Sequence, residues 1–351
     1  MLIKRILLVS VAILLVGAFV LAGCTKPTPA PSEAIELKFN IHCPGKAQMS
    51  VYEPVEYFRT EIERRTSGRV KIVMFYGATL APPTETFEAV IKGVCDIGET
   101  NIGFTQGRFP ASEACCLPLG FPSAWVKGKV ITDFYNEFKP EEYDQVVPLY
   151  FCSPPPFVTG TTKKRMQKVE DFRGLTLRAT GPGTDLVKAL GAVPKSAPIN
   201  EVYELLAKHV VDGLVASIEA YPPFKFNEVI KYVFDTSCVS PGDVSYVVMN
   251  KDSWDKISPE DQKIIREVAD EGMEMRGKSW DKAAQEAKGA FLALPDKEWV
   301  TPTSDEAAKL KAIAQSVIND WIKAKTAEGY PAADYVKYVE ERVDYWSERQ
   351  P

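Results

Sequence analysis

The feature that most restricts the fold is a regular alternation of strand-like and helix-like hydrophobic patterns. The first set comprises a strand at residues 35–42, a helix at 52–68, a strand at 69–77, a helix at 84–93 and a strand at 94–99. Both helices end at a glycine, which readily takes the left-handed conformation that closes a helix. Strands that alternate with helices in this order predict a mostly parallel sheet covered by helices.

The same alternation begins again in the second half of the chain and ends in a helical tail. Strands are expected at 145–152, 174–180, 192–198, 212–217, 232–237 and 245–250, and helices at 184–191, 199–210, 259–294, 304–324 and 332–348. A chain of 351 residues exceeds what a single hydrophobic core usually covers. The sequence therefore predicts two α/β halves. Apolar tail positions such as Trp321, Tyr335 and Tyr345 are expected to pack back on the body or to support a dimer.

The N-terminus has the pattern of an export signal. A short basic stretch, "MLIKR", precedes an apolar run from Ile6 to Ala22, which is slightly short for a membrane-spanning helix. The run ends in "LAGC", which resembles a bacterial lipoprotein cleavage box and implies lipidation of Cys24. We therefore predict a signal peptide at 1–23 and a proline-rich tether at 24–34. The mature protein is expected to be extracytoplasmic, anchored to the cell membrane by lipid or in the periplasm; a plain transmembrane anchor is the alternative.

Composition argues against several kinds of site. The net charge is −5 and no long basic run occurs, so we expect no nucleic-acid partner. The chain has two histidines, far apart, and no CxxC pair, so we expect neither a zinc site nor another metal or cofactor. Apart from Cys24, we interpret the cysteines as small buried apolar residues whose pairing the sequence leaves open: Cys43, Cys95, Cys115, Cys116, Cys152 and Cys238.

One segment, "GLTLRATGPGTD" at residues 174–185, combines a strand, a glycine turn and the start of a helix. Gly181 and Gly183 fit the first two positions of the dinucleotide pattern GxGxxG, but Leu186 stands at the third, which argues against a nucleotide site. Ligands of open α/β sheets bind where strands end and helices begin. Arg178 stands there, and a guanidinium group matches a carboxylate. A solvated arginine on a strand edge is the alternative interpretation.

A longer stretch around Arg178 carries a family resemblance. The segment "DFRGLTLRATGPGTDLVKALGAVPKSAPINEVYELLAKHVVDG" strongly resembles the solute-binding proteins of tripartite ATP-independent periplasmic (TRAP) transporters. The resemblance continues in "GRVKIVMFYGATLAPPTETFEAVIKGVCDIGE", "LPLGFPS" and "DSWDKISPEDQKIIREVADE", and it spans about residues 35–290 in the expected order. No single motif decides the assignment, but the ordered series is specific.

The resemblance implies a two-domain, type II-like periplasmic-binding-protein fold with a long bridging helix. Domain I is expected at 35–153 plus about 243–282. Domain II is expected at 154–242 plus about 283–351, which includes the C-terminal helices. It also implies a receptor, not an enzyme, that closes on an organic acid and delivers it to a TRAP membrane permease.

The resemblance also assigns site residues. Arg178 matches the family arginine that clamps the ligand carboxylate. Glu99, in the motif "DIGETN" with Thr100 and Asn101, matches a position where some members place a ligand-facing glutamate; a helix-capping acid is the alternative. The family asparagine of "DGQENP" is replaced by Ala216, and its proline by Ser217. Some keto-acid-binding members use a tryptophan and a glutamate near 215–216 to help hold a metal; Val215 and Ala216 stand there in this chain, so the resemblance implies no metal.

The replaced polar residues predict the class of ligand. A second family arginine falls near Phe157 or Val158, so a second carboxylate on the ligand would be poorly matched. We therefore expect a ligand with one carboxylate and an apolar or aromatic body. Phe157, Tyr221 and Trp125 are candidate walls of the pocket, or else ordinary core residues.

Other function classes remain open from the sequence. A four-carbon diacid is the alternative ligand, and a ligand-sensing lipoprotein that signals to a membrane receptor would use the same fold. An enzyme would need a nucleophile with a base, a carboxylate pair or a metal cluster. Glu99 and Glu219 are the one carboxylate pair to consider, and nothing in the sequence sets their separation.

Overall fold

The structure of the protein is a computed structural model that describes residues 34–45 and 50–351. The predicted signal peptide, Cys24 and most of the tether lie outside the described residues. Ile35–Pro351 form one compact unit that contains both sheets. In the part of the chain that the structure describes, no helix is both long and apolar enough to span a bilayer.

The first sheet has five strands in the order β2-β1-β3-β10-β4. Its strands are β1 (Ile35–Ile41), β2 (Val70–Tyr76), β3 (Ile97–Asn101), β4 (Val146–Cys152) and β10 (Ser245–Asn250). β1 pairs in parallel with β2 and β3, whereas β10 is antiparallel to both of its neighbours. Apolar side chains on the two faces of this sheet form two separate core clusters.

The second sheet has six strands in the order β11-β9-β5-β8-β6-β7. Its strands are β5 (Phe157–Thr161), β6 (Thr176–Arg178), β7 (Val193–Lys195), β8 (Gly213–Ser217), β9 (Tyr232–Phe234) and β11 (Glu298–Val300). β6 pairs in parallel with β7 and β8, and β5 is antiparallel to β8 and β9. The expectation of mostly parallel sheets is therefore only partly right, because each sheet is mixed.

Both reversed strands are entered from the other sheet through a short crossing. β11 also follows a strand of the first sheet, but it is reached through residues 251–297 and is parallel to β9. β5 follows β4 of the first sheet through residues 153–156, and β10 follows β9 of the second sheet through residues 235–244. Parallel neighbours are joined by returning helices within one sheet, whereas a strand entered from the other sheet need not share their direction. The two reversed strands therefore coincide with the two short crossings.

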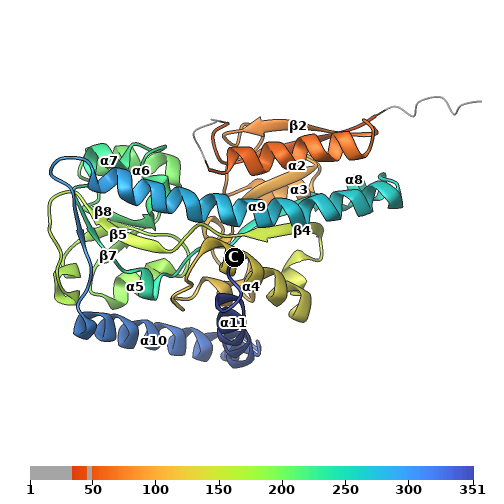
Figure 1. Cartoon of the computed structure of the whole chain (residues 1–351). Coiled ribbons are helices and arrows are strands. Elements are labelled where there is room, and N and C mark those ends of the chain that lie inside the picture. The colour runs from red at the N-terminus through yellow and green to blue at the C-terminus, as the bar shows by residue number, and fades with distance from the viewer. Residues whose placement is uncertain (1–33, 46–49) are drawn as a thin grey trace, which may run out of the picture. The chain divides into compact units, whose positions relative to one another are not determined.

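Helices cover the faces of both sheets (Figure 1). They are α2 (Tyr52–Arg65), α3 (Thr86–Ile91), α4 (Ala124–Phe138), α5 (Gly183–Ala189), α6 (Val202–Ala207), α7 (Phe226–Val229), α8 (Lys251–Asp255), α9 (Pro259–Leu292), α10 (Ser304–Ala327) and α11 (Ala332–Ser347). The long helix α9 contacts α2, α4 and β4 and also the short helix η6 (Ile218–Ala220), which follows β8. It therefore joins the two sheets, as the expected bridging helix would.

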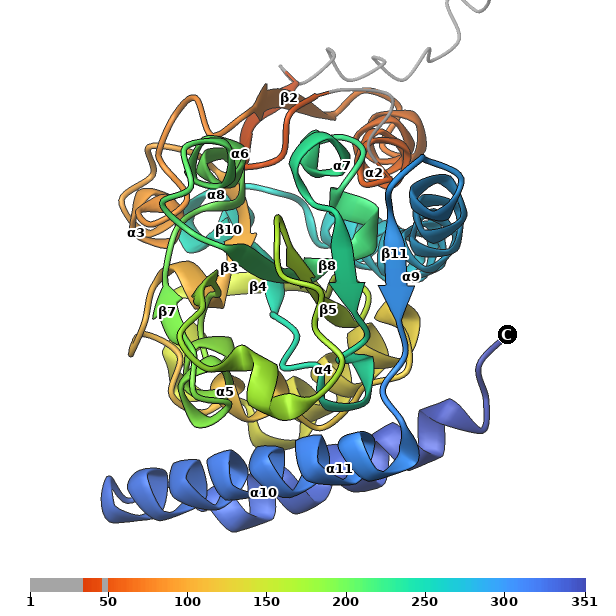
Figure 2. The ribbon, with the colours of Figure 1, turned by 90° about the vertical axis from the view of Figure 1, so that its left-hand side faces the viewer.

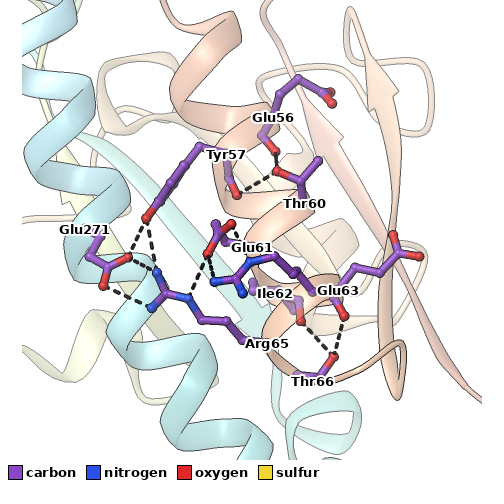
Figure 3. A network of polar contacts seen from close by, with 10 residues as sticks. Glu56, Tyr57, Thr60, Glu61, Ile62, Glu63, Arg65, Thr66 and Glu271 are labelled. Carbon is purple, nitrogen blue, oxygen red and sulfur yellow. Dashed lines mark hydrogen bonds and ion pairs between the residues drawn. The ribbon is translucent and has the colours of Figure 1, made fainter.

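Polar contacts fasten α9 to α2 (Figure 3). Arg65 donates to both carboxylate oxygens of Glu271, at 3.0 and 2.6 Å, and Tyr57 donates to the same carboxylate at 2.6 Å. Arg65 also donates to Glu61, 2.9 Å away and one turn earlier in α2. Because Glu271 is 44% exposed, this network is well solvated and orients the helices more than it stabilises them.

The helical tail packs back on the body, as Figure 2 shows for α10 and α11. α10 contacts α5 and α11 contacts α4. Tyr335 is buried and Trp321 is partly buried in the core around the first sheet, whereas Tyr345 is 39% exposed. The six described cysteines are free thiols; five are buried and Cys238 is half-buried, as expected for small apolar residues.

Candidate functional site

A cavity of about 710 Å³, part of it open to solvent, lies between the two sheets. Its lining comes from strand ends of both sheets, from the crossings between them and from α9. The lining residues are His42, Cys43, Ser50, Val51, Asn101, Phe104, Pro154, Phe157, Arg178, Thr180, Ile199, Ala216, Ser217, Glu219, Ala220, Pro223, Phe224, Asp243, Ser245 and Trp280. Arg178 ends β6, His42 directly follows β1 and Glu219 lies two residues after β8, and such strand ends are where open α/β sheets bind ligands.

Arg178 ends β6 and is the one arginine among the lining residues of this cavity. It is only 3% exposed, and its Nε donates to the carbonyl oxygen of Ala197 at 2.9 Å. Among residues 34–45 and 50–351, its two terminal nitrogens have no hydrogen-bond acceptor. Burial lowers the pKa of Arg178 to about 10, and the Asp243 carboxylate opposes this shift. The side chain thus remains a cation at neutral pH, with its planar end free to bind an anion.

The glycine turn after Arg178 brings the edges of the cavity together. Gly181 has a φ of +50°, and a Cβ there would lie 3.3 Å from the Cα of Gly103, which precedes Phe104 in η1 (Ile102–Phe104). Gly183 similarly faces Pro241, where a Cβ would lie 3.2 Å from the proline ring. The glycines therefore permit close contact between segments that follow β6 and β3, and they form no phosphate loop.

A buried carboxylate and a buried ammonium group lie near Arg178. Asp243 accepts hydrogen bonds from the backbone N–H of Gly103 at 3.2 Å and of Val244 at 2.9 Å, while burial raises its pKa. Lys127, on α4, is fully enclosed, and its Nζ lies 4.5 Å from the centre of the Phe121 ring. Burial lowers the pKa of Lys127, and Asp243 opposes that shift. Two buried groups of opposite charge therefore lie at the crossing before β10, beside the cavity.

Glu99 does not line the cavity, contrary to the expectation of a ligand-facing glutamate. Both of its oxygens accept hydrogen bonds from Arg276 of α9, at 2.6 Å each, and the two side chains are 0% and 1% exposed. The Arg276 guanidinium lies 4.5 Å from the ring centre of Trp280, a wall of the cavity. Glu99 lies in β3, so it caps no helix either. A carboxylate already bound at both oxygens is not free for a ligand or for pairing with Glu219.

Three further candidates lie away from the cavity. Thr100 faces away from it because successive side chains of a strand point to opposite faces, and its neighbour Asn101 lines it. Tyr221 is fully buried in the core beside Phe226 and Phe291. Trp125 is buried in the core of the first sheet, where its Nε1 donates to Glu274 at 2.6 Å. For both aromatic residues the alternative of core packing is correct.

Four predicted residues line the cavity together with Arg178. Phe157 begins β5, Ala216 and Ser217 end β8, and Asn101 ends β3. The Asn101 side-chain oxygen accepts a hydrogen bond of 2.6 Å from Ser245, another lining residue. The structure therefore brings residues 101, 157, 178 and 216–217 together, although they come from four different strands.

Most of the aromatic lining residues, and the polar residue His42, were not predicted from the sequence. Phe104, Phe224 and Trp280 join Phe157 as aromatic lining residues, and His42 lies beside Phe104 with ring centres 5.9 Å apart. Burial lowers the pKa of His42, so its ring is neutral at neutral pH. His42 directly follows a strand, the same signal that pointed to Arg178, whereas Trp280 lies on α9 and has no such signal.

One cluster of residues beside the cavity has metal-binding side chains, but its surroundings disfavour a metal cation. Ligand atoms of His42, Cys43 and Glu99 lie within 4.8 Å of one another. The Glu99 oxygens, however, already bind the Arg276 guanidinium, and a metal cation placed there would meet that positive charge. Burial also raises the pKa of the Cys43 thiol, which disfavours the thiolate that binds metals. These residues support a buried ion pair beside the cavity better than a metal centre.

Comparison with known proteins gives the same architecture. The family model "Bacterial extracellular solute-binding protein, family 7" (DctP) matches residues 44–324. A monocarboxylate 2-oxoacid-binding periplasmic protein of Nostoc sp. strain PCC 7120 is 23% identical over 276 residues, which cover 75% of this chain and 74% of that protein.

Two solved structures of TRAP solute-binding proteins are similar throughout. One, from a marine metagenome and specific for aromatic acid ligands, was crystallised with 3-hydroxybenzoate. It is 25% identical with a TM-score of 0.84, over 90% of this chain and 99% of that chain. The other, from Rhodoferax ferrireducens T118 with copurified benzoate, is 22% identical with a TM-score of 0.84, over 91% of this chain and 100% of that chain. The chain therefore belongs to family 7 of the bacterial extracellular solute-binding proteins, the DctP family of TRAP transporter receptors.

Proposed function

We propose that this protein is an extracytoplasmic receptor that binds an organic acid by its carboxylate and delivers it to a TRAP membrane permease. The observation that carries the proposal is Arg178, a buried cation whose planar end faces a cavity lined by aromatic side chains. A bidentate arginine–carboxylate pair would satisfy its two terminal nitrogens. The proposed role is to bind the acid and release it unchanged, and this arrangement of residues suffices for that role.

We further propose that the ligand has one carboxylate and an apolar or aromatic body. Phe104, Phe157, Phe224 and Trp280 offer ring faces to such a body. Arg178 is the one arginine or lysine among the described lining residues of this cavity, so a second ligand carboxylate would meet no second cation among them. The aromatic acids bound by the two similar structures support this class of ligand.

The domain division expected from the sequence supports a closing motion about the cavity. We propose that 35–153 with about 243–282, and 154–242 with about 283–351, are the two bodies that move. The crossings at 153–156 and 235–244 connect the two sheets and are the natural hinges. A ligand bound by residues of both bodies would favour the closed form.

A thermal-shift panel tests the ligand class. We expect benzoate, 3-hydroxybenzoate or mandelate to raise the unfolding midpoint of the full chain in detergent, and succinate and malate to leave it unchanged. A ligand at a hundred times its Kd stabilises by about 2.7 kcal/mol, which is roughly 4 °C for a chain of this length, whose unfolding entropy is about 0.7 kcal/mol/K. A midpoint rise confined to the diacids would contradict the monocarboxylate proposal.

We propose lipidation of Cys24 as the membrane anchor, although this residue lies outside the described part. Several acyl chains on one residue anchor far more firmly than one. Replacing Cys24 by serine should move the protein from the membrane fraction to the soluble fraction of the cell envelope, as measured by immunoblotting after ultracentrifugation. The replacement of Cys238, a half-buried thiol, by serine is the matched control and should leave the protein in the membrane fraction. Retention of the Cys24→Ser variant in the membrane would show that the leader is an uncleaved anchor.

A further inference from the structure

A second polar group faces the cavity without a partner. Glu219, in the short helix η6 after β8, lines the cavity, and its Oε2 is buried. Among the described residues, Oε2 accepts no hydrogen bond and no cation forms an ion pair with Glu219. Ser217 Oγ and His42 Nδ1, which belong to other lining residues, are likewise buried without a partner within the described chain. Buried polar atoms nearly always have a partner in the protein, in ordered water or in a ligand, so these atoms are available to a polar group on the ligand.

The surroundings of Glu219 favour its neutral form. Burial raises its pKa to about 8, and Asp281 of α9 adds to the shift, whereas the backbone N–H groups of Glu219 and Ala220 oppose it. The other neighbours bring no positive charge, because Cys43 and Tyr221 are neutral groups whose pKa values Glu219 itself raises. His42 beside Cys43 is neutral as well, since burial lowers its pKa. Arg178 lines the same cavity but is not among the charges that shift Glu219.

We propose that Glu219 forms a second polar subsite, in which its protonated carboxyl group donates a hydrogen bond to a hydroxyl or carbonyl oxygen on the body of the ligand. This inference rests on the proposed function, because it requires a carboxylate held by Arg178 in the same cavity. It narrows the proposed class of ligands: the protein should bind hydroxy- or oxo-substituted monocarboxylic acids more tightly than acids with a plain hydrocarbon body.

Protonation makes the subsite compatible with an anionic ligand. An ionised Glu219 would repel the ligand carboxylate and offer only an acceptor to a carbonyl oxygen, whereas the neutral carboxyl group offers a donor. Hydroxy- and oxo-acids should therefore bind with full affinity below the pKa of Glu219. Their affinity should fall as the pH rises through this pKa. With a pKa of about 8, the protonated fraction falls about tenfold between pH 7 and pH 9, and the affinity falls in proportion.

Calorimetric titration of the full chain in detergent with mandelate and phenylacetate tests the subsite, since the two acids differ by one hydroxyl group. We expect mandelate to bind wild type at least fivefold more tightly than phenylacetate at pH 7, and about tenfold more weakly at pH 9 than at pH 7. E219Q keeps a donor, so it should retain the preference at both pH values. E219L should lose the preference. E204Q, on the exposed face of α6, is the matched control and should behave as wild type.

The outcomes separate the subsite from the proposed function. If neither acid binds wild type at pH 7, the monocarboxylate function itself is overturned, and the subsite with it. If both acids bind and E219L keeps the preference for mandelate, only the subsite is overturned. A loss of affinity at pH 9 that also occurs in E219Q would belong to Arg178 or another group and would overturn the role of Glu219. If phenylglycine binds more tightly than mandelate, Glu219 is ionised and faces the ammonium group of the ligand. That result would also overturn the role of Glu219 as a protonated donor.

Discussion

Replacement of Arg178 by alanine is expected to abolish measurable binding of monocarboxylates while leaving the protein folded. Each charge-assisted hydrogen bond to the ligand carboxylate contributes roughly 1.5–3 kcal/mol, so the loss of two raises the Kd on the order of 10² to 10⁴-fold. The Asp243 carboxylate, whose charge acts on Arg178, would also lose this nearby cation and repel the ligand carboxylate more strongly. Calorimetric titration with whichever of benzoate, 3-hydroxybenzoate and mandelate gives the largest thermal shift in wild type measures the effect.

Two further variants show whether the planar pair of donors of Arg178, its charge alone, or a general loss of structure explains the effect. Arg178→Lys keeps a cation but loses the planar pair of donors, so its affinity should lie between those of wild type and the alanine variant. Arg173→Ala, in the same segment but exposed, should bind as wild type. Without ligand, Arg178→Ala should unfold at the wild-type midpoint or above it, because within the described chain this buried cation has the Ala197 carbonyl as its one hydrogen-bond partner. Wild-type affinity of Arg178→Ala would contradict the clamp assignment.

The elements that the sequence predicted well are those with local signals. The helix expected at 52–68 is α2, and the expected glycine stop, Gly68, has a φ of +78°. The helix expected from Pro259 is α9, which begins after Ser258, whose side chain accepts a hydrogen bond from the backbone of Asp261. A cap, a stop and one apolar face are contained within a few residues, so they can be read without knowledge of the fold.

The elements that the sequence did not predict lack such signals. In α4 the five residues from Ala124 to Gly128 are all buried, because α9, α11 and β4 pack around this helix and erase its periodicity. All five residues of β5 are buried too, and three prolines precede the strand. A segment enclosed on every side has no polar face to reveal its period.

The candidate site divides in the same way. Arg178 was predicted from its place at a strand end and from the family resemblance, and Asn101 from the resemblance alone. His42 directly follows β1 and Glu219 lies two residues after β8, so both carry a strand-end signal. Glu99 was expected to face a ligand, but its partner Arg276 lies 177 residues further along the chain. Nothing near either residue in the sequence indicates the pairing, because only the path of α9 across the first sheet brings them together.

The Glu99–Arg276 pair supplies the largest stability effect that we expect. Glu99→Gln should lower the free energy of unfolding by about 3–5 kcal/mol, because it leaves the Arg276 cation buried without a counter-charge. The guanidinium also lies against Trp280, so the wall of the cavity should loosen and ligand affinity should fall less steeply than in Arg178→Ala. Urea denaturation followed by circular dichroism measures the stability, and calorimetric titration measures the affinity.

The pair of Glu271 with Arg65 provides a matched control on the same helix. It has the same bidentate geometry as the buried pair, but Glu271 is 44% exposed, so Glu271→Gln should cost less than about 1 kcal/mol. The double variant Glu99→Gln, Arg276→Met should recover part of the loss seen in Glu99→Gln, because no unpaired charge stays buried. Equal costs for Glu99→Gln and Glu271→Gln would contradict the prediction, since burial is the property that separates the two pairs.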